Sequence, residues 1–136
     1  MKKKYFLISH NEYALGLKKA LEMIVGEQAN LTAYGLMPGG HPDDIANEIE
    51  KQIDDETQVV ILGDIAGGSV CNSCLPLTTK PNVVLVTGTN LPLAMEIVVA
   101  QISDKQAIDT IIAACREGMR TLTLELSNED GGDDFF

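Results

Sequence analysis

Two side chains that could act together chemically stand at the ends of two largely apolar runs in this sequence. His10 follows the first run, predicted as a strand over residues 4–9, and Asp64 ends another, predicted over residues 58–64. Such runs are typical of strands buried on both faces of a parallel sheet. A histidine at a strand end can be a nucleophile, a base, a metal ligand or without function, and a carboxylate beside it narrows these choices.

A carboxylate paired with an imidazole favours nucleophilic chemistry. When the carboxylate accepts a hydrogen bond from Nδ1–H, Nε2 is left free to attack. The carboxylate also stabilises the positive ring that forms when Nε2 is substituted, by about 1.5–3 kcal/mol for a charge-assisted hydrogen bond. Because a phosphorus–nitrogen bond to imidazole breaks readily, such a histidine suits a relay. We therefore predict that His10 carries a phosphoryl group and that Asp64 supports it.

The loop after Asp64 supplies a third part, a site for an anion. Gly67 and Gly68 let the backbone approach an anion closely, and Ser69 can donate from its hydroxyl. The helix predicted from Ser69 onward also presents N–H groups at its start. A glycine pair alone could mean only a tight turn. Beside a histidine and an aspartate, it predicts phosphate binding at Gly67, Gly68 and Ser69.

The elements that must position these residues follow from the alternation of apolar spacings. We predict strands over residues 4–9, 31–35, 58–64 and 82–88, with helices beginning near residues 14, 42, 69 and 90, and a last helix from a capping box at residues 103–106 to Gly118. In the first helix the predicted inner stripe is Ala14, Leu17, Leu21, Ile24 and Val25. This alternation predicts an α/β fold, a doubly wound, mainly parallel sheet of order 2-1-3-4 with helices on both faces. The first and third strands are then neighbours at the point where the winding reverses, which is where ligands bind, so His10 and Asp64 should meet there.

The end of the chain differs from the rest. Residues 121–126 alternate strictly between polar and apolar, so we predict a C-terminal antiparallel edge strand. Because it is too weak to remain an exposed edge, we expect it to pair with the sheet of a second copy in a homodimer. Residues 127–136 are acidic and glycine-containing and are predicted to be a disordered tail, which leaves residues 1–126 as a single domain.

Composition excludes several functions. A net charge of −10 and a pI near 4.4 argue against nucleic-acid binding. The same charge fits either a basic protein partner or solubility alone. No apolar run in the 136 residues approaches the roughly 20 residues needed to span a bilayer. No signal-peptide core is visible either, so we expect a cytoplasmic protein.

The sequence lacks the residues that several other kinds of functional site need. Cys71 and Cys74 form a C-x-x-C pattern, but no second ligand pair accompanies it, so we expect buried reduced thiols and no metal or other cofactor. A receiver domain needs an acidic pair after its first strand, and a phosphoglycerate-mutase-like site needs an arginine beside its histidine. Neither dinucleotide nor Walker-type glycine motifs occur. His41, just before Pro42, is predicted to be an exposed helix-cap residue.

Four blocks of residues together point to one family. They are Ser9-His10 with Ala14 and Gly16; Glu22-Met23 with residues 26–28; Asp64 with Gly67, Gly68, Ser69 and Asn72; and residues 88–92. The chain up to about Leu124 resembles the enzyme IIA component of the mannose-family (mannose, fructose or sorbose type) sugar phosphotransferase system. The residue after the histidine is often glycine in that family, and the loop serine is usually followed by proline. Here Asn11 and Val70 occupy these positions.

This resemblance implies a phosphotransferase that works through phosphohistidine. His10 would accept a phosphoryl group from phospho-HPr and pass it to an enzyme IIB partner, with the membrane subunits IIC and IID served indirectly. Asp64 would bond the histidine, and the glycine–serine loop would help to receive the phosphate. The resemblance also implies a dimer whose C-terminal strand is exchanged, and the acidic tail leads us to expect IIB on a separate chain. The alternative is a regulatory sensor of phosphorylation state that uses the same histidine without transport flux.

Overall fold

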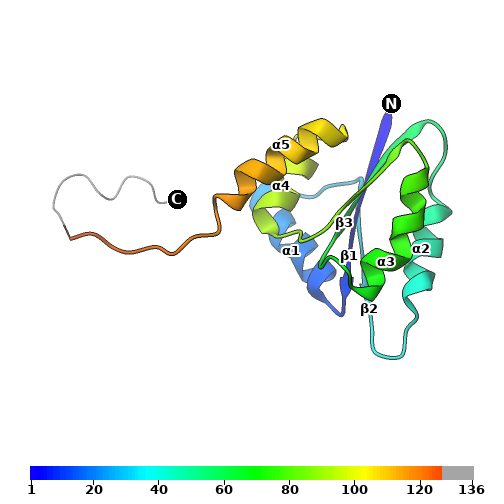
Figure 1. Cartoon of the computed structure of the whole chain (residues 1–136), viewed down its shortest axis with the longest axis horizontal. Coiled ribbons are helices and arrows are strands. Elements are labelled where there is room, and N and C mark those ends of the chain that lie inside the picture. Colours follow the sequence, from blue (N-terminus) through cyan, green and yellow to red (C-terminus); the bar gives the residue numbers. More distant parts are fainter. Residues whose placement is uncertain (127–136) are drawn as a thin grey trace.

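Four parallel strands form the centre of the protein. The computed structural model describes residues 1–126 and arranges the strands in the order β2-β1-β3-β4 (Figure 1). This order confirms the prediction. The strands are β1 (Lys2–His10), β2 (Leu31–Leu36), β3 (Thr57–Gly63) and β4 (Val83–Val86). The predicted acidic tail, residues 127–136, lies outside the described residues.

Helices cover both faces of this sheet, as a doubly wound fold requires. One face carries α1 (Tyr13–Val25), α4 (Leu91–Val99) and α5 (Lys105–Arg116). The other carries α2 (Pro42–Glu50) and α3 (Ser69–Cys74), and α3 continues into a 3₁₀ helix, η1 (Leu75–Thr79). Figure 1 shows these two groups on opposite sides of the strands.

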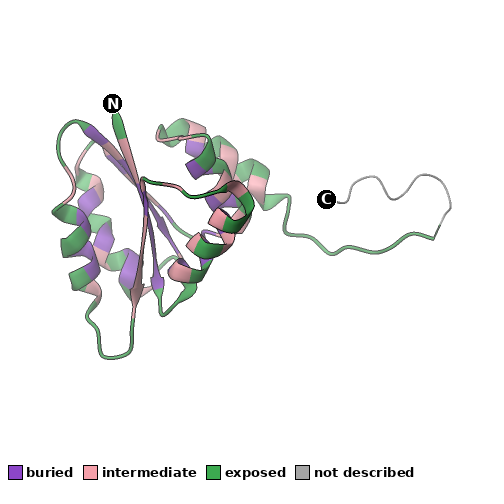
Figure 2. Cartoon of the chain, turned by 180° about the vertical axis from the view of Figure 1, so that it is seen from behind, coloured by how far each residue is buried: buried purple, intermediate pink, exposed green. Residues whose placement is uncertain are grey.

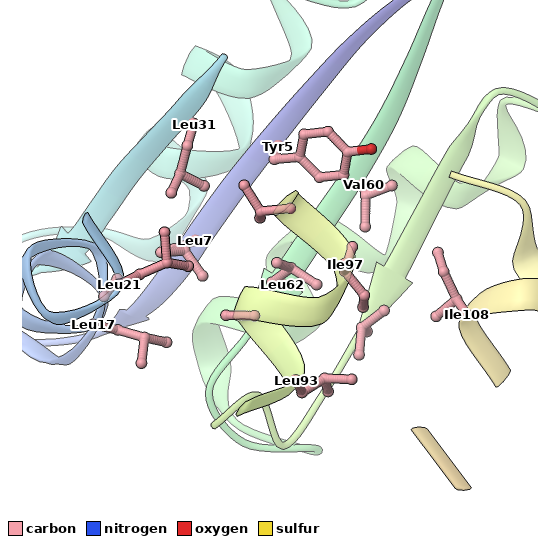
Figure 3. Close-up of a cluster of buried hydrophobic side chains, with 14 residues drawn as sticks. Tyr5, Leu7, Leu17, Leu21, Leu31, Val60, Leu62, Leu93, Ile97 and Ile108 are labelled. Atoms are coloured by element: carbon pink, nitrogen blue, oxygen red, sulfur yellow. The ribbon is translucent and has the colours of Figure 1, made fainter. Parts of the chain in front are cut away.

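Alternate residues of the central strands feed two separate cores. Tyr5 and Leu7 of β1 face the side of α1, α4 and α5, where they belong to one core cluster with Leu62, Leu93 and Ile97 (Figure 3). The intervening β1 residues join the core under α2 and α3. Because the strands are buried on both faces, their apolar runs are nearly continuous. Figure 2 shows buried residues along the strands and on the sheet side of the helices.

The register of the strands determines which residues reach the carboxyl edge together. Ile8 of β1 pairs with Gly63, the last residue of β3. His10 pairs with Leu36 at the end of β2. The residues that follow β1 and β3 therefore emerge side by side, at the edge where the winding reverses.

Several predicted element ends are wrong. The last helix is capped by Asp104, whose carboxylate accepts from the Ala107 N–H at 2.9 Å, so Ser103 does not form the predicted capping box. β4 ends at Val86, and Gly88 beyond it has a positive φ of 71°, which breaks the strand. Ile24 is exposed although it was placed on the inner stripe of α1.

Residues 121–126 form no strand in the described chain, and all six are exposed. Figure 1 shows this segment leading away from the sheet. The predicted antiparallel strand needs a partner edge, so it stays a prediction. Within residues 1–126, no helix combines the length and apolar character needed to cross a membrane.

Candidate functional site

The predicted pair of His10 and Asp64 comes together at the carboxyl edge of the sheet. His10 is the last residue of β1, and Asp64 directly follows β3. The Nδ1 atom of His10 lies 2.9 Å from Oδ2 of Asp64, with side-chain exposures of 46% and 13%. The imidazole is therefore open to solvent, while the carboxylate that holds it is largely enclosed.

Asp64 is bound through both of its oxygens. Oδ2 accepts from the backbone N–H of His10 at 2.9 Å as well as from the ring, and Oδ1 accepts from the Ile65 N–H at 2.8 Å. Burial by itself raises the pKa of Asp64, but the hydrogen bonds from His10 and Ile65 outweigh it, and the pKa lies below its usual range. Asp64 is consequently a charged acceptor at neutral pH.

The geometry assigns a role to each ring nitrogen of His10. An ionised carboxylate can only accept, so Nδ1 carries the proton that Asp64 binds. In the neutral ring Nε2 is then an acceptor, and the Ser69 hydroxyl lies 3.2 Å from it. Nε2 is thus the unprotonated atom on the partly exposed ring, the arrangement that a nucleophilic histidine needs.

The glycine loop is shaped by two different constraints. Gly67 has a positive φ of 79°, which favours glycine, and its carbonyl accepts from the Asn72 side chain at 3.2 Å. At Gly68 a Cβ would lie 3.0 Å from Cε1 of His10 and 2.8 Å from the Ile65 side chain. Gly68 therefore makes room for the imidazole, a reason that differs from the predicted approach to an anion.

Backbone and side-chain contacts fix the turn that follows His10. Asn11 adopts a positive φ of 50°, and its N–H donates to Leu36 O at 2.7 Å. A Cβ at Gly35 would lie 2.1 Å from the Asn11 carbonyl oxygen, so this oxygen occupies the space that a side chain at position 35 would need. The buried Ser9 hydroxyl accepts from the Ala14 N–H at 2.7 Å and joins β1 to α1. The role of Gly35 was missed, although a glycine inside a strand pattern often marks close backbone approach.

The remaining candidates lie as expected. His41 is the exposed N-cap of α2, and its Nδ1 accepts from the Asp43 N–H at 3.2 Å. Cys71 and Cys74 are buried free thiols on α3. Burial raises the pKa of Cys74 to about 11, so this thiol stays protonated at neutral pH.

Comparison with known proteins identifies the family to which this site belongs. Residues 4–115 match the family model of EIIA-man, described as "PTS system fructose IIA component". The chain belongs to this family. The resemblance read from the four blocks of residues is therefore confirmed.

Three known proteins show how similar this chain is to its relatives in sequence and in structure. The sorbose-specific EIIA component of Klebsiella pneumoniae is 32% identical over 93 residues, covering 66% of this chain and 68% of the relative. The mannose-specific EIIAB component of Escherichia coli (strain K12) is 28% identical over 122 residues, covering 84% of this chain but 38% of the relative. This chain thus spans about two fifths of that longer protein. The mannose/sorbose-specific IIA subunit of Enterococcus faecalis superposes with a TM-score of 0.79 at 25% identity, over 93% of this chain and all of that one.

Proposed function

We propose that this EIIA-man protein is a phosphoryl carrier of a sugar phosphotransferase system. His10 accepts a phosphoryl group from phospho-HPr and passes it to an enzyme IIB partner, which couples the chain to sugar uptake. The observation that carries the proposal is the orientation of the His10 ring, with Nδ1–H held by Asp64 and the unprotonated Nε2 beside the Ser69 hydroxyl. Family membership supports the same role.

The transfer uses this ring as follows. The Nε2 lone pair forms a bond to phosphorus while the bond from phosphorus to the donor breaks, and that electron pair leaves with the donor. The proton on Nδ1 stays in place, so the substituted ring is positively charged and faces the negative charge of Asp64. Onward transfer reverses these steps. The acceptor attacks phosphorus, and the bonding pair returns to Nε2.

The Ser69 hydroxyl and the first N–H groups of α3 donate hydrogen bonds to the phosphoryl oxygens. Once Nε2 is substituted, the Ser69 hydroxyl loses its acceptor there and becomes free to donate to the phosphoryl group. The first N–H groups of a helix have no partner within the helix and can donate in the same direction. Phosphoryl transfer needs donor and acceptor roughly in line, with phosphorus between them. A separation of 3.2 Å between Nε2 and the Ser69 oxygen leaves no room for this, so Ser69 binds the group without accepting it.

Assembly forms the second part of the proposal, a homodimer with exchanged C-terminal strands. β4 is an edge strand, and an open groove of about 430 Å³ runs beside it. Its lining includes Val84 and Leu85, with Lys105 at one side. Residues 121–126 carry three exposed leucines at alternate positions and the acidic Glu125, a strand pattern that suits this groove in a second copy. Deleting residues from 121 onward should give monomers or aggregates by light scattering, and an intact protein that is monomeric at micromolar concentration would contradict the dimer.

The function is tested by reconstituting the transfer. The protein is incubated with phosphoenolpyruvate, enzyme I and HPr, and the label is mapped by digestion and mass spectrometry. We expect acid-labile, base-stable phosphorylation at His10, followed by loss of the label when a IIB protein is added. Absence of label at His10 would contradict the proposal. Label that no IIB protein removes would instead indicate a regulatory sensor of phosphorylation state.

A further inference from the structure

The short helix α3 contacts both members of the His10–Asp64 pair. At its first residue, the Ser69 hydroxyl lies 3.2 Å from Nε2 of His10. Two residues later, the sulfur of Cys71 lies 4.0 Å from Oδ1 of Asp64. The first contact belongs to the phosphoryl site described above. The second has no part in that mechanism, and it places a thiol against the far oxygen of the carboxylate that orients the histidine.

Cys71 is in the right protonation state to act as a donor. Its side chain is 2% exposed. Burial raises the pKa of the Cys71 thiol and the charge of the Asp64 carboxylate raises it further, while the backbone N–H groups of Ile65 and Asp64 lower it without cancelling the rise. The thiol is therefore neutral at physiological pH, with an S–H group that is a weak donor. Its neighbour is an ionised carboxylate, which is the strongest kind of acceptor.

Gly63 makes this contact possible. It is the last residue of β3, immediately before Asp64. A Cβ at Gly63 would lie 2.3 Å from the sulfur of Cys71 and 3.3 Å from the Val86 carbonyl oxygen. The thiol thus occupies the space that a side chain at position 63 would need. This fit lets α3 approach the turn that carries Asp64.

We propose that Cys71 is a positioning residue of the phosphoryl-carrying site, donating its S–H hydrogen bond to Oδ1 of Asp64. Together with the Ile65 N–H on the same oxygen, this bond limits rotation of the carboxylate, so that Oδ2 stays aligned with Nδ1 of His10. The effect on transfer rests on the proposed function, whereas the contact itself does not. In the simpler explanation, Cys71 only fills the core between α3 and the sheet.

The chain contains a matched control for that explanation. Cys74 lies one turn further along α3 and is also buried and free. Among the hydrogen bonds of residues 1–126, none joins Cys74 to Asp64. Cys71→Ala and Cys74→Ala each remove one buried sulfur from the same helix, and only the first removes the contact with the carboxylate. A difference between them therefore isolates the contact from the loss of packing.

The first experiment observes the bond directly in the unphosphorylated protein. The S–H stretching band of Cys71 is assigned in the infrared spectrum by its disappearance in Cys71→Ser. We expect this band to move to higher frequency in Asp64→Asn, because a neutral amide is a weaker acceptor than a carboxylate. The bands of Cys74 and Cys115 should stay in place. A Cys71 band that does not respond to Asp64→Asn would overturn the proposal.

The second experiment measures transfer from phospho-HPr by rapid quench. Cys71→Ala should be slower by about twofold to fivefold, as expected for loss of one weak hydrogen bond. Cys71→Ser keeps a donor and should recover most of the rate, while Cys74→Ala and Cys74→Ser should match the unmutated protein. Equal rates for Cys71→Ala and Cys74→Ala would overturn the proposal. If the unmutated protein takes no label, the proposed function fails, and the infrared experiment still decides whether Cys71 binds Asp64.

Discussion

The two histidines of the described chain have the same kind of partner but very different surroundings. His10 meets Asp64 from a neighbouring strand, with 2.9 Å between Nδ1 and the carboxylate oxygen. His41 meets Asp43 from the same turn, with 3.7 Å between the corresponding atoms. The carboxylate side chain is 13% exposed in the first pair and 64% exposed in the second. A solvent-exposed pair contributes little because water screens it.

The difference shows what makes a histidine chemically useful in this fold. At His41, Nδ1 accepts a hydrogen bond from the Asp43 N–H, so that nitrogen is used to cap α2. At His10, Nδ1 donates to a carboxylate that the sheet holds in place, and Nε2 is left for reaction. The sequence distance between histidine and aspartate is 54 residues in one case and two in the other. The register of the sheet, and not proximity in sequence, brings His10 and Asp64 together.

The most decisive way to break this comparison is to remove each histidine. His10→Ala should fold normally and accept no phosphoryl group, because no other described side chain has this arrangement. His41→Ala should be labelled at the unmutated rate, with unfolding made easier by about 0.5–2 kcal/mol through loss of the helix cap. The measurement is radiolabel incorporation with the phosphoenolpyruvate, enzyme I and HPr mixture. Loss of label in His41→Ala, with label retained in His10→Ala, would reverse the assignment.

Replacing each aspartate tests whether the strand-borne carboxylate matters. In Asp64→Asn the amide oxygen can still accept from Nδ1–H, but the charge opposite the positive ring is lost. That part of the bond is about 1–2 kcal/mol, and tenfold in rate corresponds to about 1.4 kcal/mol. Transfer from phospho-HPr should therefore slow by roughly fivefold to thirtyfold, and by more if the amide turns and stabilises the wrong tautomer. Asp43→Asn is the control and should transfer normally, with circular dichroism confirming both folds.

The contact between Gly68 and the His10 ring can be tested with the two glycines of the loop. In Gly68→Ala the new methyl group would lie 3.0 Å from Cε1 of His10, so the ring must shift away from Asp64 or Ser69. We expect transfer slowed by about threefold to tenfold, which corresponds to roughly 0.7–1.4 kcal/mol. Gly67→Ala has open space but a positive φ, so it should lose stability by about 1–3 kcal/mol and keep its rate once folded. Equal rates for the two variants would mean that the ring is not confined by Gly68.

The smallest effect concerns stability in acid. Because the folded protein holds the pKa of Asp64 below its usual range, its contribution is complete above the unfolded-state value of about 4. It is lost as the pH falls through the lower folded-state pKa. The difference in unfolding free energy between the unmutated protein and Asp64→Asn should therefore shrink below about pH 4. Urea titrations at several pH values measure it, and a difference that grows in acid would contradict the assigned direction.

Much of the site could be predicted from the sequence because the order of the strands depends on the pattern of whole segments. Apolar runs and their spacing were enough to make the first and third strands neighbours, which put His10 beside Asp64. The positive φ of Asn11 also agrees with its residue type, since asparagine tolerates that conformation. These features depend on residue types and on the period of the pattern. They do not require knowledge of individual side-chain contacts.

What the sequence did not indicate depends on contacts across the fold. The closeness of Gly35 to Asn11, of Gly68 to the His10 ring and of Cys71 to Gly63 becomes visible only when the elements are packed. The helix start at Asp104 was missed because Ser103 with Gln106 also fits a capping box, and the two choices differ by one residue. Ile24 also fitted the helical period, but Val25, the next residue of α1, packs against the core and Ile24 is exposed.

The single open nitrogen of His10 has a kinetic consequence. On the proposed function, one nitrogen of one ring serves both the protein that delivers the phosphoryl group and the protein that removes it, so the two cannot dock together. On the proposed function the chain follows substituted-enzyme (ping-pong) kinetics. An excess of unphosphorylated HPr competes with IIB for the loaded carrier, and an excess of IIB blocks the empty one. Throughput in the cell then has a maximum at balanced partner levels and falls when either is overproduced.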